Sequence, residues 1–514
     1  MSEGTVRRLR SGSTADRVRV AIRAPRRLSI GMPGLLRRVP SAALVCASIA
    51  FLNAAAWSLI VPPFQGKDES EHFAYVEQLA ENGTLPESAT GAYSPGESLV
   101  LGGLHYQEVV HAPETPAISS EAEQRTLMQD VNAGASLRGT GNAGVAASEP
   151  PLYYALETIP YALGGSNLLT KLQLMRLLGA LFGAITALLC FLFIREVLPG
   201  TPWAATVGGL CVALQPLLAF MSGSVNPDSL FYAVSAAVFL CLARAFRRGL
   251  SRRLAVALGA AIAIGFLTKL NFVGLALGVF LGLALLAARG LRARGRRGLY
   301  RPALAAGIGV VPVALYAVRN ILTNRPTFGI VSGGTGLVTT HSLLHQISYI
   351  WQLYLPRLPG MTPYFAGIAT YKDIWFDRSV GLYGWMDTVF PTWVDNVALV
   401  LAAAVALLLI RELLRRRAAL RARTAELVVY ATMTLGVLVL IGASSYVSDV
   451  LGRGAAFGEP RYLLPLLPLL GAALALAVRG AGRRWAPVVG AALVVLFLGH
   501  DVFSQLQTIA RYYG

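Results

Sequence analysis

Residues 40–79 read PSAALVCASIAFLNAAAWSLIVPPFQGKDESEHFAYVEQL, an apolar run joined to a segment dense in ionisable side chains. A helix needs about 20 apolar residues to cross a bilayer, and the run from residue 40 to residue 61 has that length. Pro62 and Pro63 then end the span, because proline lacks a backbone N–H and restricts the residue before it. The stretch therefore predicts a first span followed by a charged helix at the membrane surface.

The rest of the chain repeats the apolar pattern. Of its 514 residues, 55% are hydrophobic and 14% are charged, with a mean hydropathy of +0.56; soluble globular proteins carry about 25% charged residues. We predict an all-α polytopic membrane protein with about 11 transmembrane helices. The transmembrane domain covers residues 40–514 and includes two large external segments, 63–167 and 320–392. Residues 1–39 are predicted to be a disordered cytoplasmic tail.

The net charge of +18 is carried by short arginine-rich segments that alternate with the apolar runs. They lie at residues 7–38, 244–253, 289–301, 411–423 and 479–484, as the positive-inside rule requires of cytoplasmic connections. Topology and contact with anionic membrane lipids explain this charge, so nucleic acid is not an expected partner. The predicted location is a bacterial plasma membrane, crossed many times, with the N-terminus in the cytoplasm.

Cysteines and glycine motifs exclude several classes of protein. All 4 cysteines fall in apolar runs, which predicts buried free thiols and no disulfide framework. The sequence contains no P-loop, dinucleotide-binding glycine motif or Gly-x-Ser-x-Gly motif. ATP-driven transport within this chain and use of nucleotide sugars by a Rossmann domain are therefore not expected.

The helix after the first span, predicted over residues 67–83, carries the densest ionisable cluster. Helical spacing places four side chains on one face: Asp68, Glu71, His72 and Tyr75. Phe73 and Val76 lie on another face, which can contact the membrane. Acidic residues in a first turn also suit the helix dipole, but that accounts for only one or two carboxylates. We interpret the cluster as functional, with a capped surface helix as the alternative.

An external acidic pair after the first span resembles the GT-C superfamily of membrane glycosyltransferases. EPPLYYAL (residues 149–156) resembles the Pro-Pro-x-Tyr-Tyr element that closes their first external loop. Further blocks that are similar are SVNPDSLFY (224–232), FLTKLNFVGL (266–275), YAVRNILTNRPTFG (316–329), RSVGLYGWMDTVFPTWV (378–394) and GEPRYLLPLLPLL (458–470). Together they resemble an uncharacterised bacterial family of GT-C-like proteins, the domain-of-unknown-function 2142 family.

The resemblance implies a reaction and its participants. A sugar would move from a polyprenyl-phosphate donor to a cell-envelope glycan or lipid acceptor at the outer face, with inversion. The acidic residue after the first span is the usual general base in GT-C enzymes, which maps to Asp68, with Glu69 as the alternative. The scarce external cations, Lys269, Arg319 and Arg461, together with Tyr462, are expected at the donor phosphate; snorkelling to the interface or salt bridges within the bundle are the alternatives.

Other polar and aromatic residues of the external side are candidates for substrate binding. They are Glu71, His72, Tyr75, Glu149, Tyr153, Asn226, Asp228, Trp385 and Asp387. For Asn226 and Asp228 a plain turn with a helix cap is the favoured explanation, and for Trp385 an interfacial aromatic anchor is the default. The metal content is left open: three histidines, His72, His105 and His111, and the external carboxylates suit Mg²⁺, Mn²⁺ or Ca²⁺, but no ligand spacing selects a set.

Two other functions fit the composition. One is a transporter or flippase of lipid-linked or small polar substrates, and the other is a non-catalytic protein of cell-envelope assembly. Transporters place ionisable residues near the middle of the membrane, on broken helices. The predicted spans are nearly free of charge at mid-depth, which favours the enzyme.

Overall fold

The computed structural model describes residues 39–86, 92–110, 112, 114–117, 120–136, 143–325, 343–364, 371–385, 388–450 and 458–514. Almost all of the described secondary structure from Ser41 to Gly514 is helical, which agrees with the predicted fold class. The one sheet in this described part has two short antiparallel strands, β1 (Leu382–Tyr383) and β2 (Thr388–Val389). The predicted boundary between tail and transmembrane domain stays a prediction, because residues 1–38 lie outside the described residues.

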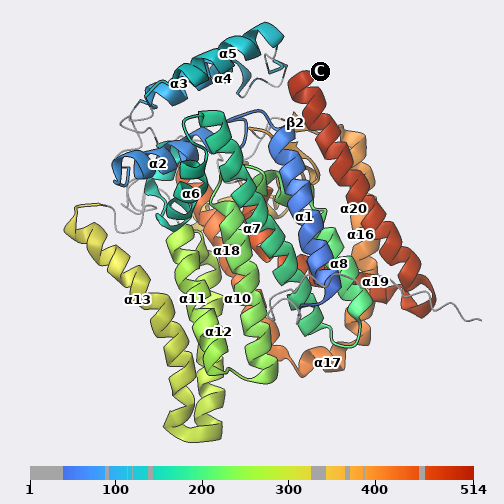
Figure 1. Cartoon of the computed structure of the whole chain (residues 1–514). Coiled ribbons are helices and arrows are strands. Elements are labelled where there is room, and N and C mark those ends of the chain that lie inside the picture. Colours follow the sequence, from blue (N-terminus) through green and yellow to red (C-terminus); the bar gives the residue numbers. More distant parts are fainter. Residues whose placement is uncertain are drawn as a thin grey trace, which may run out of the picture. The chain divides into compact units, whose positions relative to one another are not determined.

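Long apolar helices run side by side and make up most of this unit (Figure 1). They are α1 (Ser41–Ile60), α7 (Leu168–Val197), α10 (Asp228–Arg248), α11 (Arg252–Thr268), α12 (Phe272–Arg294), α13 (Tyr300–Leu322), α16 (Thr392–Arg415), α18 (Thr424–Val450), α19 (Leu467–Gly480) and α20 (Gly482–Tyr513). α8 (Pro202–Ala213) and α9 (Pro216–Ser222) form a further pair that is bent by 54°. A proline opens each helix of this pair, at a position where its missing N–H leaves no hydrogen bond unmade.

Eight stretches of the described chain are long and apolar enough to cross a membrane, or nine if the bent pair is one span. The predicted number of eleven is therefore not confirmed. Phe272–Leu322 counts as one stretch although it contains both α12 and α13, joined by the short turn η3 (Gly295–Leu299). The 17 residues of α11 are fewer than the ~20 of a full span.

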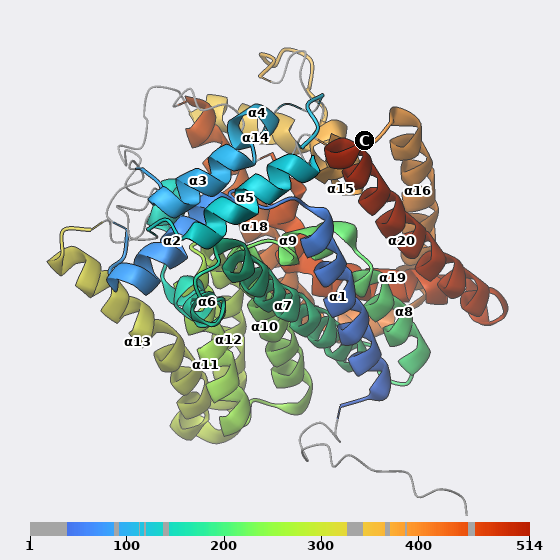
Figure 2. The same cartoon turned by 45° about the horizontal axis from the view of Figure 1, so that its top comes forward.

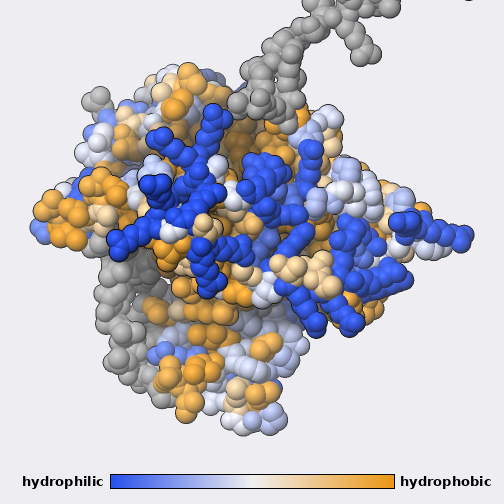
Figure 3. Space-filling view, turned by 90° about the horizontal axis from the view of Figure 1, so that it is seen from below, coloured by the Kyte–Doolittle hydropathy of each residue, from blue (hydrophilic) through white to orange (hydrophobic). Residues whose placement is uncertain are grey.

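Short helices gather at one end of the long ones (Figures 1 and 2). They are α2 (Glu69–Asn82), α3 (Pro95–Gly103), α4 (Tyr106–Val109), α5 (Glu121–Ala133), η2 (Gly144–Ser148), α6 (Leu152–Leu163), α14 (Leu343–Tyr354), η5 (Asp373–Asp377), α15 (Arg378–Val380) and η6 (Pro460–Leu466). The opposite end carries η3 and α17 (Arg417–Arg421). Figure 3 shows that hydrophilic side chains gather on the face at this opposite end. The arginine-rich connections thus lie away from α2, as predicted.

Two predictions about buried residues have different outcomes. All four cysteines are free and buried, as expected. The expected membrane contact of α2 is wrong: Phe73 and Val76 are both fully buried inside the protein. Phe73 packs edge-to-face on Phe64, from the turn before α2, and against Tyr161 of α6. The apolar face of α2 therefore holds this helix onto the rest of the protein.

Glycines let α12 and α18 approach closely, as small residues do between membrane helices. A methyl group on Gly278 of α12 would lie 2.6 Å from the backbone nitrogen of Met433 in α18. Gly274 of α12 and Gly436 of α18 meet in the same interface. By contrast, a methyl group on Gly307 of α13 would have no described atom within 4 Å.

We expect Gly278→Ala to lower the melting temperature of the purified protein, because the added methyl forces α12 away from α18. Overpacking of this kind costs about 1–3 kcal/mol. Gly307→Ala adds the same methyl to open space and is the matched control, with an unchanged or slightly raised melting temperature. Thermal unfolding in detergent, followed by size-exclusion chromatography, measures both. Equal melting of the two variants would show that this interface is not tightly packed.

Candidate functional site

The turn between α1 and α2 is closed by one arginine. Pro62 and Pro63 prevent α1 from continuing, so the last carbonyl groups of that helix need other donors. Arg176 of α7 supplies them: its Nη1 donates to the carbonyls of Ser58 and Val61, both at 2.8 Å, and its Nη2 donates to the carbonyl of Pro62 at 2.9 Å. The end of the first span is therefore capped by a side chain from the second.

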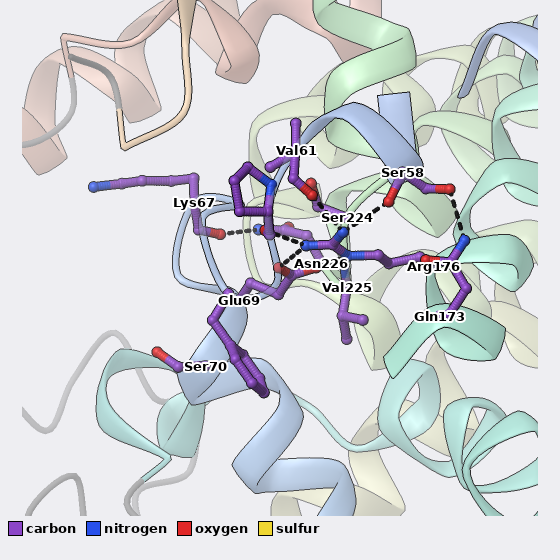
Figure 4. A network of polar contacts seen from close by, with 12 residues as sticks. Ser58, Val61, Lys67, Glu69, Ser70, Gln173, Arg176, Ser224, Val225 and Asn226 are labelled. Carbon is purple, nitrogen blue, oxygen red and sulfur yellow. Dashed lines mark hydrogen bonds and ion pairs between the residues drawn. The ribbon is translucent and has the colours of Figure 1, made fainter. Parts of the chain in front are cut away.

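The same guanidinium binds Glu69 with two parallel hydrogen bonds (Figure 4). Nε donates to Oε1 at 2.8 Å and Nη2 donates to Oε2 at 2.5 Å. Both residues are buried, with exposures of 0% for Glu69 and 2% for Arg176. Glu69 Oε1 also accepts the backbone N–H of Val225, in the turn between α9 and α10, at 2.9 Å. This carboxylate is enclosed by donors, so it has no surface to offer a substrate.

Further contacts fix the backbone of the turn ahead of Asp68. Trp385 Nε1 donates to the carbonyl of Phe64 at 3.3 Å, and Asn226 Nδ2 donates to the carbonyl of Lys67 at 3.1 Å. A methyl group on Gly66 would lie 2.7 Å from the hydroxyl of Ser224, so only glycine fits there. Figure 4 shows the Lys67 side chain pointing away from the Arg176 network. The side chains of Lys67 and Asp68, the last two residues of the turn, therefore lie on the side away from Arg176.

Asp68 lies at the N-terminal boundary of α2 in a left-handed conformation, with φ 58°. Its side chain makes no cap hydrogen bond to the helix; instead, Arg461 Nη2 donates to its Oδ2 at 3.1 Å. Lys67 Nζ lies 3.7 Å from Asp68 Oδ1 and 4.0 Å from Glu459, which pairs with Arg461 Nε at 2.6 Å. Two carboxylates and two cations therefore alternate in one cluster.

The charge of Asp68 is held by its neighbours. Burial by itself would raise the pKa of this carboxyl, but the charges of Arg461 and Lys67 outweigh it and hold the pKa below its ordinary value of 3.8. Its side chain is 16% exposed, whereas that of Arg461 is 5% exposed. Asp68 is thus an ionised, partly accessible carboxylate beside a buried guanidinium.

A second ion pair lies next to this cluster. Lys269, between α11 and α12, places its Nζ 2.7 Å from Oδ1 of Asp228, at the start of α10. Lys269 Nζ and Arg461 Cζ lie 5.9 Å and 5.0 Å from the ring centre of Tyr462. Asp228 Oδ2 and Arg461 Nη1 are buried and have no hydrogen-bond partner among the described residues. Buried polar groups are normally paired, so these two atoms mark a place for a polar ligand or water.

A small cavity of about 10 Å³, room for about one water molecule, lies beside these two residues. Its polar lining is Asp228, Asn271, Arg461 and Tyr462, and its apolar lining comes from α10, α18 and η6: Phe231, Tyr232, Val437, Leu440, Ile441 and Pro465. Tyr232 donates to the carbonyl of Arg461 at 3.2 Å, which fixes the backbone of η6 there. The cavity therefore has a charged end and an apolar wall.

The face of α2 next to Asp68 packs on the Tyr-Tyr element of α6. His72 Nδ1 lies 2.9 Å from the hydroxyl of Tyr154, and the rings of Tyr75 and Tyr154 stack at 3.7 Å. Burial lowers the pKa of His72 to about 3, so this imidazole is neutral near pH 7. Glu149 accepts the backbone N–H of Leu270 at 3.5 Å, and burial raises the pKa of its carboxyl. These groups form a largely neutral wall beside the charged cluster.

Among the predicted site residues, Glu69 is bound to Arg176, and the others fall into three sets. Near the charged cluster lie Asp68, Arg461, Tyr462, Lys269, Asp228, Asn226, His72, Tyr75, Glu149 and Trp385, the last at 4.6 Å from Lys67 Nζ. Three others have contacts of their own: Tyr153 packs on Tyr154 and Phe182, Glu71 lies against Gly144, and Arg319 donates to its neighbour Asn320. Asp387 lies outside the described residues. No described group of three or more His, Cys, Asp and Glu side chains could hold a metal ion, and His111 is not described.

Sequence reasoning missed several members of this region. Lys67 and Glu459 stand beside Asp68 and Arg461 in the sequence, so proximity along the chain was an available signal. Arg176 was also available, as a lone arginine within a long apolar run, where a charge is costly and normally paired. Tyr154 belongs to the Pro-Pro-x-Tyr-Tyr element, but only its neighbour Tyr153 is among the predicted site residues. Tyr232 gave no signal, because tyrosines are common at the ends of membrane helices.

We expect Arg176→Gln to destabilise the protein by about 3–5 kcal/mol, because it leaves the Glu69 carboxylate buried without a counter-charge. Arg176→Lys should not restore stability, since a lysine cannot make the paired hydrogen bonds. Arg195→Gln, at an exposed position of the same helix, is the control. The free energy of unfolding in denaturant compares them. If Arg176→Gln unfolds like Arg195→Gln, the pair does not anchor the turn.

Comparison with known proteins adds two distant structural likenesses. The crystal structure of ArnT from Cupriavidus metallidurans bound to undecaprenyl phosphate aligns with a TM-score of 0.44 and 15% identity, over 91% of this chain and 74% of that one. The apo oligosaccharyltransferase of Archaeoglobus fulgidus aligns with a TM-score of 0.40 and 12% identity, over 91% of this chain and 56% of that one. Both are too distant to assign a function.

The family comparison is more extensive. No curated protein matches this chain. The model of one protein family matches residues 51–470, which include the turn before α2, the Tyr-Tyr element of α6 and the Arg461 block. Since this match covers most of the sequence, the chain belongs to the family described as predicted membrane protein (DUF2142).

Proposed function

We propose that this protein is a membrane glycosyltransferase that moves a sugar from a polyprenyl-phosphate donor to a cell-envelope glycan or lipid acceptor. The observation that carries the proposal is the pairing of Asp68 with Arg461 at 3.1 Å, beside a cavity with a charged end and an apolar wall. Transfer of a sugar needs a base for the acceptor hydroxyl and positive charge where the phosphate leaves. The cluster contains both.

The donor phosphate is assigned to Arg461. Its Nη1 is buried, has no described hydrogen-bond partner and lines the cavity, and a guanidinium suits two phosphate oxygens at once. Lys67 and Lys269 add positive charge around the same point, and the Tyr462 hydroxyl lies 3.2 Å from Arg461 Nη2. The phosphate would compete with Asp68 and Glu459 for these cations.

The polyprenyl chain is assigned to the apolar wall of the cavity. Val437, Leu440 and Ile441 line it from α18, and Phe231 lines it from α10. Phe231, Val437 and Ile441 are buried, so the polyprenyl chain would have to displace their side chains to enter between α10 and α18. A ligand with a phosphate at one end and a hydrocarbon chain at the other matches this order of charged and apolar lining.

Asp68 is assigned as the general base. The acceptor hydroxyl oxygen would attack the anomeric carbon as the bond from that carbon to the phosphate oxygen breaks. The hydroxyl proton goes to Asp68, polyprenyl phosphate leaves with the electron pair, and the configuration inverts. A phosphate bound at Arg461 would weaken the hold of that guanidinium on Asp68, so donor binding would increase the proton affinity of the base when it is needed.

Glu69, the other candidate for the general base, is not chosen because its carboxylate is already bound within the protein. Both of its carboxylate oxygens are used by Arg176 and Val225, and the side chain is completely buried. The resemblance of the sequence blocks to GT-C enzymes supports the same reading, because Asp68 follows the first span there. With the arginine-rich connections at the far end of the helices, the positive-inside rule puts the cluster at the outer face.

We expect Asp68→Asn to slow sugar transfer by about 10²–10⁴-fold, because the amide cannot accept the hydroxyl proton. Release of polyprenyl phosphate from polyprenyl-phosphate hexoses and pentoses, by the full chain in lipid nanodiscs, measures the rate. Asp130→Asn, on the exposed side of α5, is the matched control and should keep the wild-type rate. Wild-type release by Asp68→Asn would rule out this base. Movement of intact donor across the membrane would identify a flippase, and no turnover of any donor by the wild type would favour an assembly protein.

We expect Arg461→Gln to weaken binding of polyprenyl phosphate at least tenfold, since a hydrogen bond to a charged group contributes about 1.5–3 kcal/mol. Arg461→Lys should recover only part of the lost affinity, because lysine keeps the positive charge but lacks the two parallel N–H donors of the guanidinium. Titration of the nanodisc-embedded protein with a short-chain polyprenyl phosphate gives the affinities. Arg125→Gln, on exposed α5, is the control. Unchanged affinity for Arg461→Gln would place the phosphate elsewhere.

A further inference from the structure

A groove lies between α8 and α20 at the arginine-rich end of the helices, opposite the Asp68 cluster. Its volume is about 510 Å³, and it is lined by three residues of α8 and three of α20: Trp203, Thr206, Val207, Arg483, Ala486 and Pro487. Binding pockets for small molecules commonly have volumes of ~300–1,000 Å³. The groove therefore has room for part of a lipid molecule.

The walls and floor of the groove are mostly apolar. Ala486 is 3% exposed and forms the floor, with Pro487 and Val207 beside it. Beyond it the two helices come together, because a methyl group on Gly490 of α20 would lie 3.1 Å from Val207 of α8. The groove therefore closes toward the middle of the two helices and is open at their N-terminal ends. Trp203 lies at this open end and is 43% exposed. Tryptophan at such a position is typical of the lipid–water boundary.

Arg483 is the one charged residue that lines the groove. It is exposed, and no described residue accepts a hydrogen bond from it or forms an ion pair with it. Some other arginines at the same end have partners: Arg248 pairs with Glu196, Arg479 pairs with Glu412, and Arg423 donates to the carbonyl of Val197. Arg483 differs from the remaining exposed arginines of this end in that it lines the groove. The positive charge at the rim of the groove is therefore uncompensated, in a face that is otherwise rich in hydrophilic side chains (Figure 3).

We propose that this groove binds an anionic phospholipid of the leaflet at the arginine-rich end, with Arg483 at the lipid phosphate and an acyl chain along Val207, Ala486 and Pro487. Charge complementarity selects the anionic class, because no carboxylate lines the groove and a zwitterionic headgroup would bring a second cation toward Arg483. Basic pockets between membrane helices on the positively charged side are known places for such headgroups. The site is separate from the proposed sugar-transfer site and does not depend on that function.

Native mass spectrometry of the full chain, titrated with phosphatidylglycerol, tests the proposal. We expect Arg483→Gln to weaken binding of the first phosphatidylglycerol roughly fivefold, the loss of about one surface cation. Arg252→Gln removes the same charge from an exposed residue at the same end, at the start of α11, and should change the affinity less than twofold. Phosphatidylcholine should bind more weakly and show no difference between wild type and Arg483→Gln.

Other outcomes of the same titration would overturn the proposal. Equal weakening by Arg483→Gln and Arg252→Gln would mean that the whole basic face attracts anionic lipid without a site. If glycerol 3-phosphate, which lacks acyl chains, bound as tightly as phosphatidylglycerol, the apolar groove would not be part of the site. Thr206→Trp fills the groove without changing charge, so undiminished binding by that variant would also exclude the groove.

Discussion

The buried ion pair between Arg176 and Glu69 is the contact on which the arrangement of the end that carries α2 depends. Two charges taken out of water are costly unless their hydrogen bonds are nearly all made, and here the guanidinium makes five, two to Glu69 and three to backbone carbonyls. Those carbonyls end α1, and the carboxylate also holds the turn before α10. A single pair therefore joins the first span, the second span and the start of α2.

This anchoring separates two carboxylates that are neighbours in the sequence. Glu69 points into the protein and is used completely by Arg176 and Val225. Asp68, with its left-handed backbone, points to the other side, toward Lys67 and Arg461. Proximity in sequence made the two equivalent candidates for a base, whereas the direction of the turn gives one a structural role and leaves the other partly accessible. The position of Asp68, the proposed base, is therefore fixed by the Arg176–Glu69 pair, which has no part in the proposed reaction.

Charged side chains are paired differently at the two ends of the long helices. At the end that carries α2, Lys67, Lys269 and Arg461 lie among Asp68, Asp228 and Glu459, so positive and negative charges balance there. A phosphate that bound as proposed would have to displace carboxylates from these cations. At the arginine-rich end, Arg483 lies beside an apolar groove and has no partner among the described residues. The two proposals therefore differ in kind: exchange of an anionic ligand at the first end, and contact with membrane lipid at the second.

The sequence by itself determined the class of fold, the helical spans, the position of the charges at their ends and most members of the charged cluster, because apolar runs, prolines and scarce external cations are local signals. It did not determine the number of spans, since bends and short helices such as α11 depend on packing. It also placed Phe73 and Val76 toward the membrane. Only the tertiary structure decided that α2 buries its apolar face and that Arg461, 393 positions away in the chain, reaches Asp68. Contacts between residues so far apart are set by how the helices pack, which no local pattern encodes.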